Sequence, residues 1–190
     1  MCIIKQRRGK VVIHMPKRIA ELHEKMLAYA RQKLLQAGGP ELTIRSVANA
    51  CGVAVGTVYN YFPSKDSLVE AVIQADWEVM MVGLREELAQ ADDAMESLHV
   101  ICDKLQSFAS TYVDVLKIPP TRLHESESFR QRHGVFVEQL CDLLQPIMLR
   151  CGCMFHPVLP QFLAEALLVL AVDPSKHFEN VRPIFQKLFE

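Results

Sequence analysis

The stretch that decides the fold is Thr43 to Lys65, TIRSVANACGVAVGTVYNYFPSK. Its first part has apolar residues at the spacing that predicts one buried face of a short helix, namely Ile44, Val47, Ala48 and Cys51. Thr43 is suited to cap this helix, and Gly52 is suited to end it in left-handed backbone. A second helix is expected over about residues 55–61. Two short helices joined by a tight glycine turn predict a helix-turn-helix.

The second helix of this stretch is expected to have one buried face and one open face. Val58 and Phe62 fall on the side that a core would cover, and Pro63 and Ser64 then break the helix. The residues left facing outward are Val55, Gly56, Thr57, Tyr59 and Asn60. This outward face is the part of the chain that could enter a groove of DNA.

The run from Gly56 to Ile73, GTVYNYFPSKDSLVEAVI, resembles the signature of the TetR (tetracycline repressor) family of transcriptional regulators. In that signature a G-T-x-Y-x-Y/H-F stretch is followed by a short turn, a lysine and a long helix. The resemblance covers residues 17–73, and the remainder is similar only as an apolar helical bundle. It implies an all-α fold, with a three-helix DNA-binding domain followed by a bundle that dimerises and binds a small-molecule effector.

The expected domain organisation has three parts. Residues 1–16 form a flexible basic arm, residues 17–63 the helix-turn-helix domain, and residues 64–190 the ligand-binding and dimerisation domain, with about nine helices in all. Residues 1–16 carry four basic side chains and no acid. They could follow DNA phosphates, be a disordered leader, or be an extension upstream of a natural start at Met15.

The charge of the chain is divided sharply between its ends. Residues 1–65 contain 11 Lys or Arg and 3 Asp or Glu, whereas residues 66–190 contain 10 and 19. The formal net charge of −1 therefore hides a basic N-terminal part and an acidic remainder. A basic segment that coincides with a helix-turn-helix favours double-stranded DNA as the partner.

Each outward side chain of the helix-turn-helix has a chemistry that suits DNA. The amide of Asn60 can pair with an adenine edge, the hydroxyls of Thr57 and Tyr59 can bond to phosphate oxygens, and Lys65 supplies a positive charge. Ala54 and Val55 depart from the family pattern, because the first gives no side-chain cap and the second is apolar. The predicted DNA-contact residues are Thr43, Arg45, Val55, Gly56, Thr57, Tyr59, Asn60, Tyr61 and Lys65.

The long C-terminal part offers a candidate cavity for a moderately apolar effector. An aromatic and Met stripe at helical spacing is usually ordinary core, so it is the family resemblance that implies a pocket here. The predicted pocket residues are Trp77, Met81, Cys102, Phe108, Tyr112, Phe136 and Leu140. An effector bound there would have to favour the form of the dimer that cannot bind DNA.

The last two predicted helices, residues 162–172 and 174–189, are unusually apolar and could be either core or a subunit interface. The resemblance implies a two-fold, four-helix interface, and one self-complementary patch can serve both chains. A homodimer would also place two recognition helices on successive major-groove faces of a palindromic operator. The predicted interface residues are Phe162, Ala166, Leu167, Leu170, Phe178, Val181, Ile184, Phe185 and Leu188.

The sequence shows no motif for catalysis or for a cofactor, so no enzyme is expected. Cys151, Cys153 and His156 lie close together and could form a thiol or metal site, but no fourth ligand is nearby and no metal is expected. No apolar run approaches the length of a membrane span, and the absence of a signal-peptide pattern favours a cytoplasmic protein with reduced thiols.

Three functions remain open at this point. The first is a ligand-responsive repressor with a palindromic operator. The second is a DNA-binding protein of the same fold that is independent of ligand or controlled by a partner. The third, an enzyme or a small-molecule carrier, would need catalytic pairs of residues in the bundle, which the sequence does not show.

Overall fold

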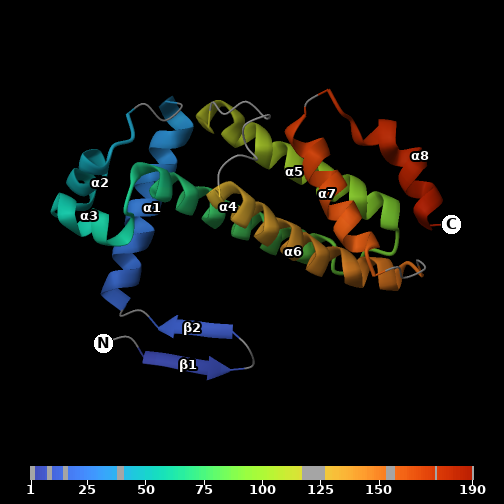
Figure 1. The fold of residues 1–190 in the computed structure, drawn as a ribbon, viewed down its shortest axis with the longest axis horizontal. Helices are drawn as coiled ribbons and strands as arrows, with labels where there is room; N and C mark the ends of the chain where they lie inside the picture. The colour runs from blue at the N-terminus through green and yellow to red at the C-terminus, as the bar shows by residue number, and fades with distance from the viewer. Residues whose placement is uncertain are drawn as a thin grey trace. The chain divides into compact units, whose positions relative to one another are not determined.

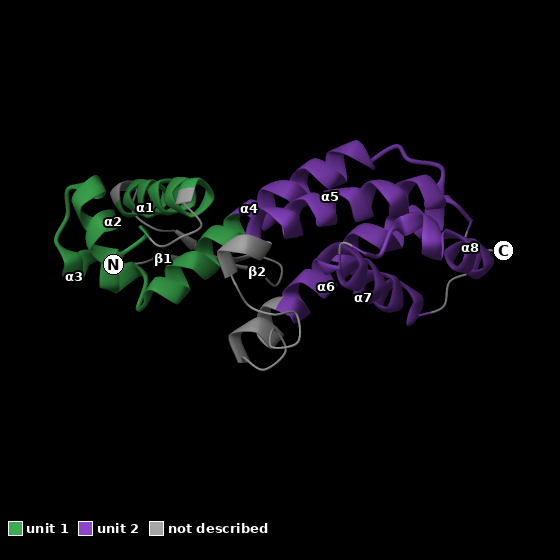
Figure 2. Cartoon of the chain, turned by 90° about the horizontal axis from the view of Figure 1, so that it is seen from above, with its two compact units in different colours: residues 1–75 green, residues 76–190 purple. Residues whose placement is uncertain are grey.

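The computed structural model describes residues 3–7, 10–14, 17–37, 41–116, 127–152, 157–173 and 175–189. The chain divides into two compact units, Met1–Ala75 and Asp76–Glu190 (Figures 1 and 2). The sequence predicted the domain boundary at residue 63, whereas the division between units falls inside a helix that continues to Glu87. None of the described helices is both long and apolar enough to cross a lipid bilayer.

Unit 1 begins with two short antiparallel strands. Strand β1 (Ile3–Arg7) pairs with β2 (Lys10–His14), so that Ile3 lies opposite His14 and Arg7 opposite Lys10. The N-terminal segment, predicted as a flexible basic arm, therefore contains a hairpin (Figure 1). Apart from this hairpin the described fold is all-α, as predicted.

The rest of unit 1 is a small helical domain. It consists of α1 (Lys17–Ala37), α2 (Ile44–Cys51), α3 (Val55–Tyr61) and the first part of α4 (Lys65–Glu87). Each helix buries apolar side chains, including Met26, Leu34, Val47, Val58 and Leu68. Helix α2 packs on both α1 and α3, and this packing fixes the angle at which α3 is presented.

Unit 2 is a bundle made of the remainder of α4 and four further helices. These are α5 (Ala94–Leu116), α6 (Glu127–Arg150), α7 (Leu159–Val172) and α8 (Phe178–Phe189). Helix α7 lies between α5 and α6, and α8 packs on α5 (Figure 1). The core is continuous, with Trp77, Ile101, Leu140 and Leu167 all almost completely buried.

The described residues contain eight helices, one fewer than the sequence predicted. Helix α6 begins at Glu127 and runs without a break to Arg150. Pro146 lies inside α6, which continues past it. Helix α7 begins three residues earlier than predicted, and α8 begins at Phe178 rather than Pro174.

Candidate nucleic-acid interface

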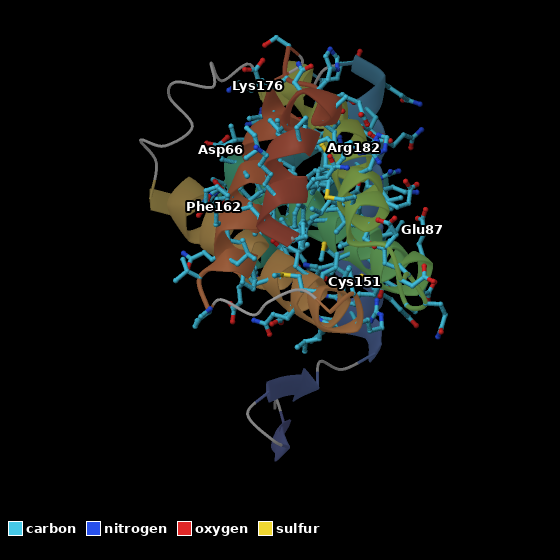
Figure 3. All side chains as sticks on the ribbon, turned by 90° about the vertical axis from the view of Figure 1, so that its right-hand side faces the viewer. Asp66, Glu87, Cys151, Phe162, Lys176 and Arg182 are labelled. Carbon is cyan, nitrogen blue, oxygen red and sulfur yellow. The ribbon has the colours of Figure 1, made fainter. Side chains whose placement is uncertain are left out.

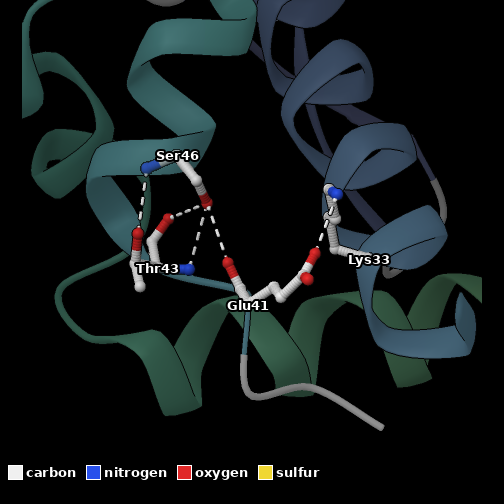
Figure 4. Close-up of polar contacts among 4 residues, drawn as sticks. All are labelled: Lys33, Glu41, Thr43 and Ser46. Atoms are coloured by element: carbon white, nitrogen blue, oxygen red, sulfur yellow. Dashed lines mark hydrogen bonds and ion pairs between the residues drawn. The ribbon is translucent and has the colours of Figure 1, made fainter. Parts of the chain in front are cut away.

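Helix α2 starts at a well-formed cap. The Thr43 Oγ1 accepts a hydrogen bond from the Ser46 backbone N–H at 3.0 Å, and the Thr43 N–H donates to Ser46 Oγ at 3.1 Å (Figure 4). This reciprocal pair satisfies two amides that a helix start would otherwise leave without partners. The cap predicted from the sequence is confirmed.

The segment before α2 is tied to α1 by an ion pair. The Lys33 Nζ lies 3.1 Å from Glu41 Oε2, and this hydrogen bond raises the pKa of Lys33 (Figure 4). The Ser46 hydroxyl in the first turn of α2 lies 3.4 Å from the Glu41 carbonyl, which links this segment to the start of the helix. Because Lys33 and Glu41 are exposed, their pair adds little stability, but it joins α1 to the entry of the helix-turn-helix.

The turn between α2 and α3 depends on Gly52. Its backbone has φ 69° and ψ 37°, the left-handed region predicted for the end of α2. The N–H groups of Gly52 and Val53 donate to the carbonyls of Asn49 and Ala48, at 3.2 and 3.0 Å. Ala54 then starts α3 with no side-chain cap, as the sequence predicted.

Two buried residues hold α3 against the rest of unit 1. Val58 is completely buried and Phe62 is 3% exposed. The Phe62 ring stacks on His23 of α1, with ring centroids 5.2 Å apart. Rotation of α3 about its axis would break these contacts, so the opposite side of the helix is presented to solvent in a fixed orientation.

The open side of α3 carries the side chains that were predicted to face DNA. Tyr59 is half exposed, and Gly56 and Asn60 are exposed, whereas Val55 and Thr57 are partly buried. A Cβ placed on Gly56 would meet no atom within 4 Å, so packing inside the chain does not require glycine there. The bare backbone at Gly56 leaves room for a phosphate or a sugar to approach.

Tyr61 was predicted as a DNA contact, and the structure places it against α1. Its hydroxyl donates to the Ile19 carbonyl at 3.4 Å, and its ring lies 6.0 Å from that of His23. This position suits a side chain that fixes α3 relative to α1. The two hydrogen-bond partners lie far apart in the sequence, so helical spacing alone gave no signal of this contact.

The start of α4 completes the candidate interface. Ser64 and Ser67 form a second reciprocal cap, in which each side-chain oxygen accepts from the other residue's N–H at 3.0 Å. Lys65 is the exposed first residue of α4, and Asp66 follows in the first turn, where a negative charge suits the helix dipole. Thr43 and Arg45 are exposed at the start of α2. Helix starts and cations of this kind bind phosphates.

Six of the seven predicted pocket residues belong to the hydrophobic core of unit 2 or pack against it, and the seventh, Tyr112, lies against Phe108. Trp77 stacks on Phe136 with centroids 3.9 Å apart, and meets Phe108 edge to face at 5.4 Å. Phe108 and Phe136 are partly buried; the other five are almost completely buried, namely Trp77, Met81, Cys102, Tyr112 and Leu140. Burial raises the pKa of Cys102 to about 11, so this thiol is protonated at neutral pH.

The nine predicted dimer residues divide into an inner and an outer set. Leu167, Leu170, Phe178 and Phe185 pack inside unit 2 and are not available at a subunit surface. Phe162, labelled in Figure 3, is 53% exposed, Ile184 is 59% exposed and Leu188 is 38% exposed, with Ala166 and Val181 partly buried. Val169 and Val172 of α7 are also exposed, and the sequence did not single them out, because an almost wholly apolar helix gives no periodicity to separate its faces.

The cysteine cluster is only partly described. Cys151, labelled in Figure 3, is half-buried, and its thiol donates to the Asp92 carbonyl at 3.2 Å. Burial raises the pKa of this thiol, which makes it less reactive. Cys153 and His156 lie outside the described residues. Among the residues that the structure describes, no three His, Cys, Asp or Glu side chains gather as they would around a metal ion.

Comparison with known proteins agrees with this geometry. Residues 27–72, which span most of the candidate interface, match the model of the family described as bacterial regulatory proteins, tetR family. The helix-turn-helix domain of the chain is therefore of the TetR type. The chain is a DNA-binding regulator built on the helix-turn-helix described above.

The curated proteins that this chain resembles carry the names of two different roles. The chain is 28% identical over 153 residues to the nucleoid occlusion factor SlmA of Vibrio vulnificus, covering 73% of this chain and 78% of that protein. It is 26% identical over 86 residues to the transcriptional regulator UidR of Escherichia coli, covering 45% and 40%. The structure of RolR in complex with resorcinol matches with a TM-score of 0.60 and 17% identity, covering 91% and 89%, which shows a shared fold.

Proposed function

We propose that the chain is a ligand-responsive repressor that binds a palindromic operator as a homodimer and leaves it when a small, moderately apolar effector binds unit 2. The observation that carries this proposal is the open side of α3. Gly56, Tyr59 and Asn60 are exposed on a helix that Val58 and Phe62 hold in one orientation. A short, fixed helix with an open polar face is what a major groove accepts.

Different side chains are proposed to contact the DNA bases and the DNA phosphates. The Asn60 amide can donate to and accept from an adenine edge at once, so it is the proposed base-reading residue. Lys65, Arg45 and Thr43 lie at helix starts, where charge and free amides suit phosphate contacts. Tyr61 is proposed not to contact DNA but to fix the position of α3 against α1, through its hydrogen bond to the Ile19 carbonyl.

A homodimer is supported by the exposed apolar side chains of α7 and α8. Phe162, Val169 and Ile184 are each at least half exposed, which is costly for large apolar groups that remain in water. A two-fold interface over this surface would cover them in both chains. Two copies of α3 would then read two half-sites about 34–36 Å apart.

An effector acting on unit 2 is supported by the course of α4. This helix begins at the candidate interface and continues into the aromatic cluster that contains Trp77. RolR, which shares the fold, was solved with a small aromatic ligand bound. An effector that favours the released form by about 5.5 kcal/mol would move the equilibrium from 1:99 to 99:1.

The test begins with selection of operator sequences by the full chain from random duplex DNA. Fluorescence anisotropy then measures affinity for the selected duplex and for random DNA. The proposal predicts a two-fold symmetric site bound at least about a thousandfold more tightly than random DNA. Equal affinity for both duplexes would contradict sequence-specific repression.

A second candidate function is suggested by the SlmA relatives, whose match spans 73% of this chain and so extends into unit 2. On this alternative, the chain binds many sites on the chromosome without a small-molecule effector. Mapping of bound sites in cells separates the two candidates. A few sites next to promoters support repression, whereas many sites spread over the chromosome support the alternative.

A further inference from the structure

The imidazole of His23 lies at the contact between α1 and the end of α3. Its ring centroid is 5.2 Å from that of Phe62, with an interplanar angle of 30°. The Tyr61 ring lies 6.0 Å away at an angle of 38°, and the Tyr61 hydroxyl donates to the Ile19 carbonyl one turn earlier in α1. His23 therefore contacts both of the residues that end α3, the helix with the open side.

The polar part of His23 is not used by this contact. The side chain is partly buried, and neither ring nitrogen makes a hydrogen bond to a residue that the structure describes. A phenylalanine ring could make the same contacts with Tyr61 and Phe62. What the imidazole adds is a positive charge that it gains and loses near neutral pH.

The groups around His23 set no fixed charge state for it. On α3, Tyr61 is the titratable residue that faces the imidazole, and Phe62 is apolar. Glu24 and Lys25 follow His23 at exposed positions and carry opposite charges. The residues one turn away along α1 carry no charge, namely Ile19, Ala20, Met26 and Leu27. A DNA phosphate is therefore the anion that would favour the charged imidazole.

We propose that His23 positions α3 for DNA and that its protonation makes operator affinity depend on pH. The faces of the Phe62 and Tyr61 rings attract a cation at these distances, so protonation strengthens the contact between α1 and α3. It also adds a positive charge to the basic unit that binds a polyanion. The inference rests on the proposed role of α3 in reading the operator.

Both effects of protonation act in the same direction. Because DNA phosphates favour the charged imidazole, DNA binding is coupled to proton uptake at His23. Operator affinity is therefore greatest at a pH where the imidazole is already charged, and it falls as the pH rises. Histidine side chains in general change charge between about pH 5 and 8, so this is the range in which the affinity is expected to change.

The test measures fluorescence anisotropy of the full chain on the selected operator and on random duplex, at about pH 5.5 and about pH 8. The natural chain is expected to bind the operator about three- to tenfold more tightly at the lower pH. His23→Phe keeps a ring and removes the charge. It should bind within about twofold of the natural chain at the higher pH, lack most of the gain at the lower pH, and there have a salt slope smaller by up to about one.

A second variant tests the positioning role of the ring. His23→Gln removes the ring as well as the charge, and it should bind the operator about three- to tenfold more weakly than His23→Phe at both pH values. Its loss on random duplex should be smaller, because contacts to phosphates alone do not require one orientation of α3. His177→Phe makes the matched change at an exposed position of unit 2 and should keep the natural pH profile.

Two results would overturn the inference. Equal pH profiles for the natural chain and His23→Phe would remove the role of the charge, and operator binding by His23→Gln as tight as that of His23→Phe would remove the positioning role. Both variants lack the charge, so if one fails to fold, the pH profile of the other decides. A natural chain without preference for the selected operator would contradict the proposed function instead, while the pH profiles on random duplex would still test the charge of His23.

Discussion

The helix pairs α2–α3 and α7–α8 present their surfaces in opposite ways. In α2–α3 the buried side is apolar, as at Val47 and Val58, and the exposed side is polar. In α7–α8 large apolar residues also lie on the exposed side, so that buried Phe185 has the 59% exposed Ile184 as its neighbour in the chain. Polarity therefore separates the two faces of the first pair, whereas it does not separate buried from exposed apolar residues in the second.

The largest effect is expected where α8 faces inward. Phe185→Ala should lower the free energy of unfolding by about 3–5 kcal/mol, because it removes a buried ring and leaves a cavity. Ile184→Ala should change the subunit's own stability by less than about 0.5 kcal/mol. Chemical denaturation at concentrations low enough to separate subunits measures both values. Equal losses would mean that the two faces of α8 are not distinct.

The next largest effect concerns the outer side of the same helix. Ile184→Glu should raise the dissociation constant of the dimer about a hundredfold, because it buries a charge in an apolar interface. Gln186→Glu adds the same charge at another exposed position of α8 and serves as the control. Sedimentation velocity across a dilution series measures the monomer fraction. A dimer that withstands Ile184→Glu would place the interface on another surface.

Substitutions on the open side of α3 and at the start of α4 should affect DNA binding in different ways. Asn60→Ala is expected to cost about 1–3 kcal/mol of operator binding and to relax preference at one base pair per half-site. Lys65→Ala should weaken binding to all sequences and lower the salt slope by about one. Anisotropy with selected and random duplexes measures both, and Asn180→Ala in unit 2 is the control. Equal loss on both duplexes for Asn60→Ala would remove its base-reading role.

The smallest effect is expected at the uncapped start of α3. Ala54→Ser should stabilise unit 1 by about 1 kcal/mol, because a serine oxygen can accept from an amide of the first turn. Thermal unfolding followed by circular dichroism measures the change. Ala50→Ser, an exposed position inside α2, supplies no cap and should be slightly destabilising. A destabilised Ala54→Ser would show that the start of α3 has no room for the cap.

The features predicted best are those set by neighbours in the sequence. The Thr43 cap, the left-handed Gly52 and the uncapped Ala54 each depend on a few adjacent residues, and all three were predicted. The hydrogen bonds of Tyr61, Asp76 and Trp77 were not, since their partners lie more than 30 residues away. The split of α8 between Phe185 and Ile184 was missed for the same reason, because α5 decides which face is covered.

The central claim is that two copies of α3 read one operator together. The most direct measurement compares the selected operator with the same operator carrying five extra base pairs between its half-sites, a change that turns one half-site to the opposite side of the duplex. The dimer should then lose at least about a hundredfold in affinity, because only one α3 can enter a groove at a time. Unchanged affinity for the lengthened operator would contradict paired reading.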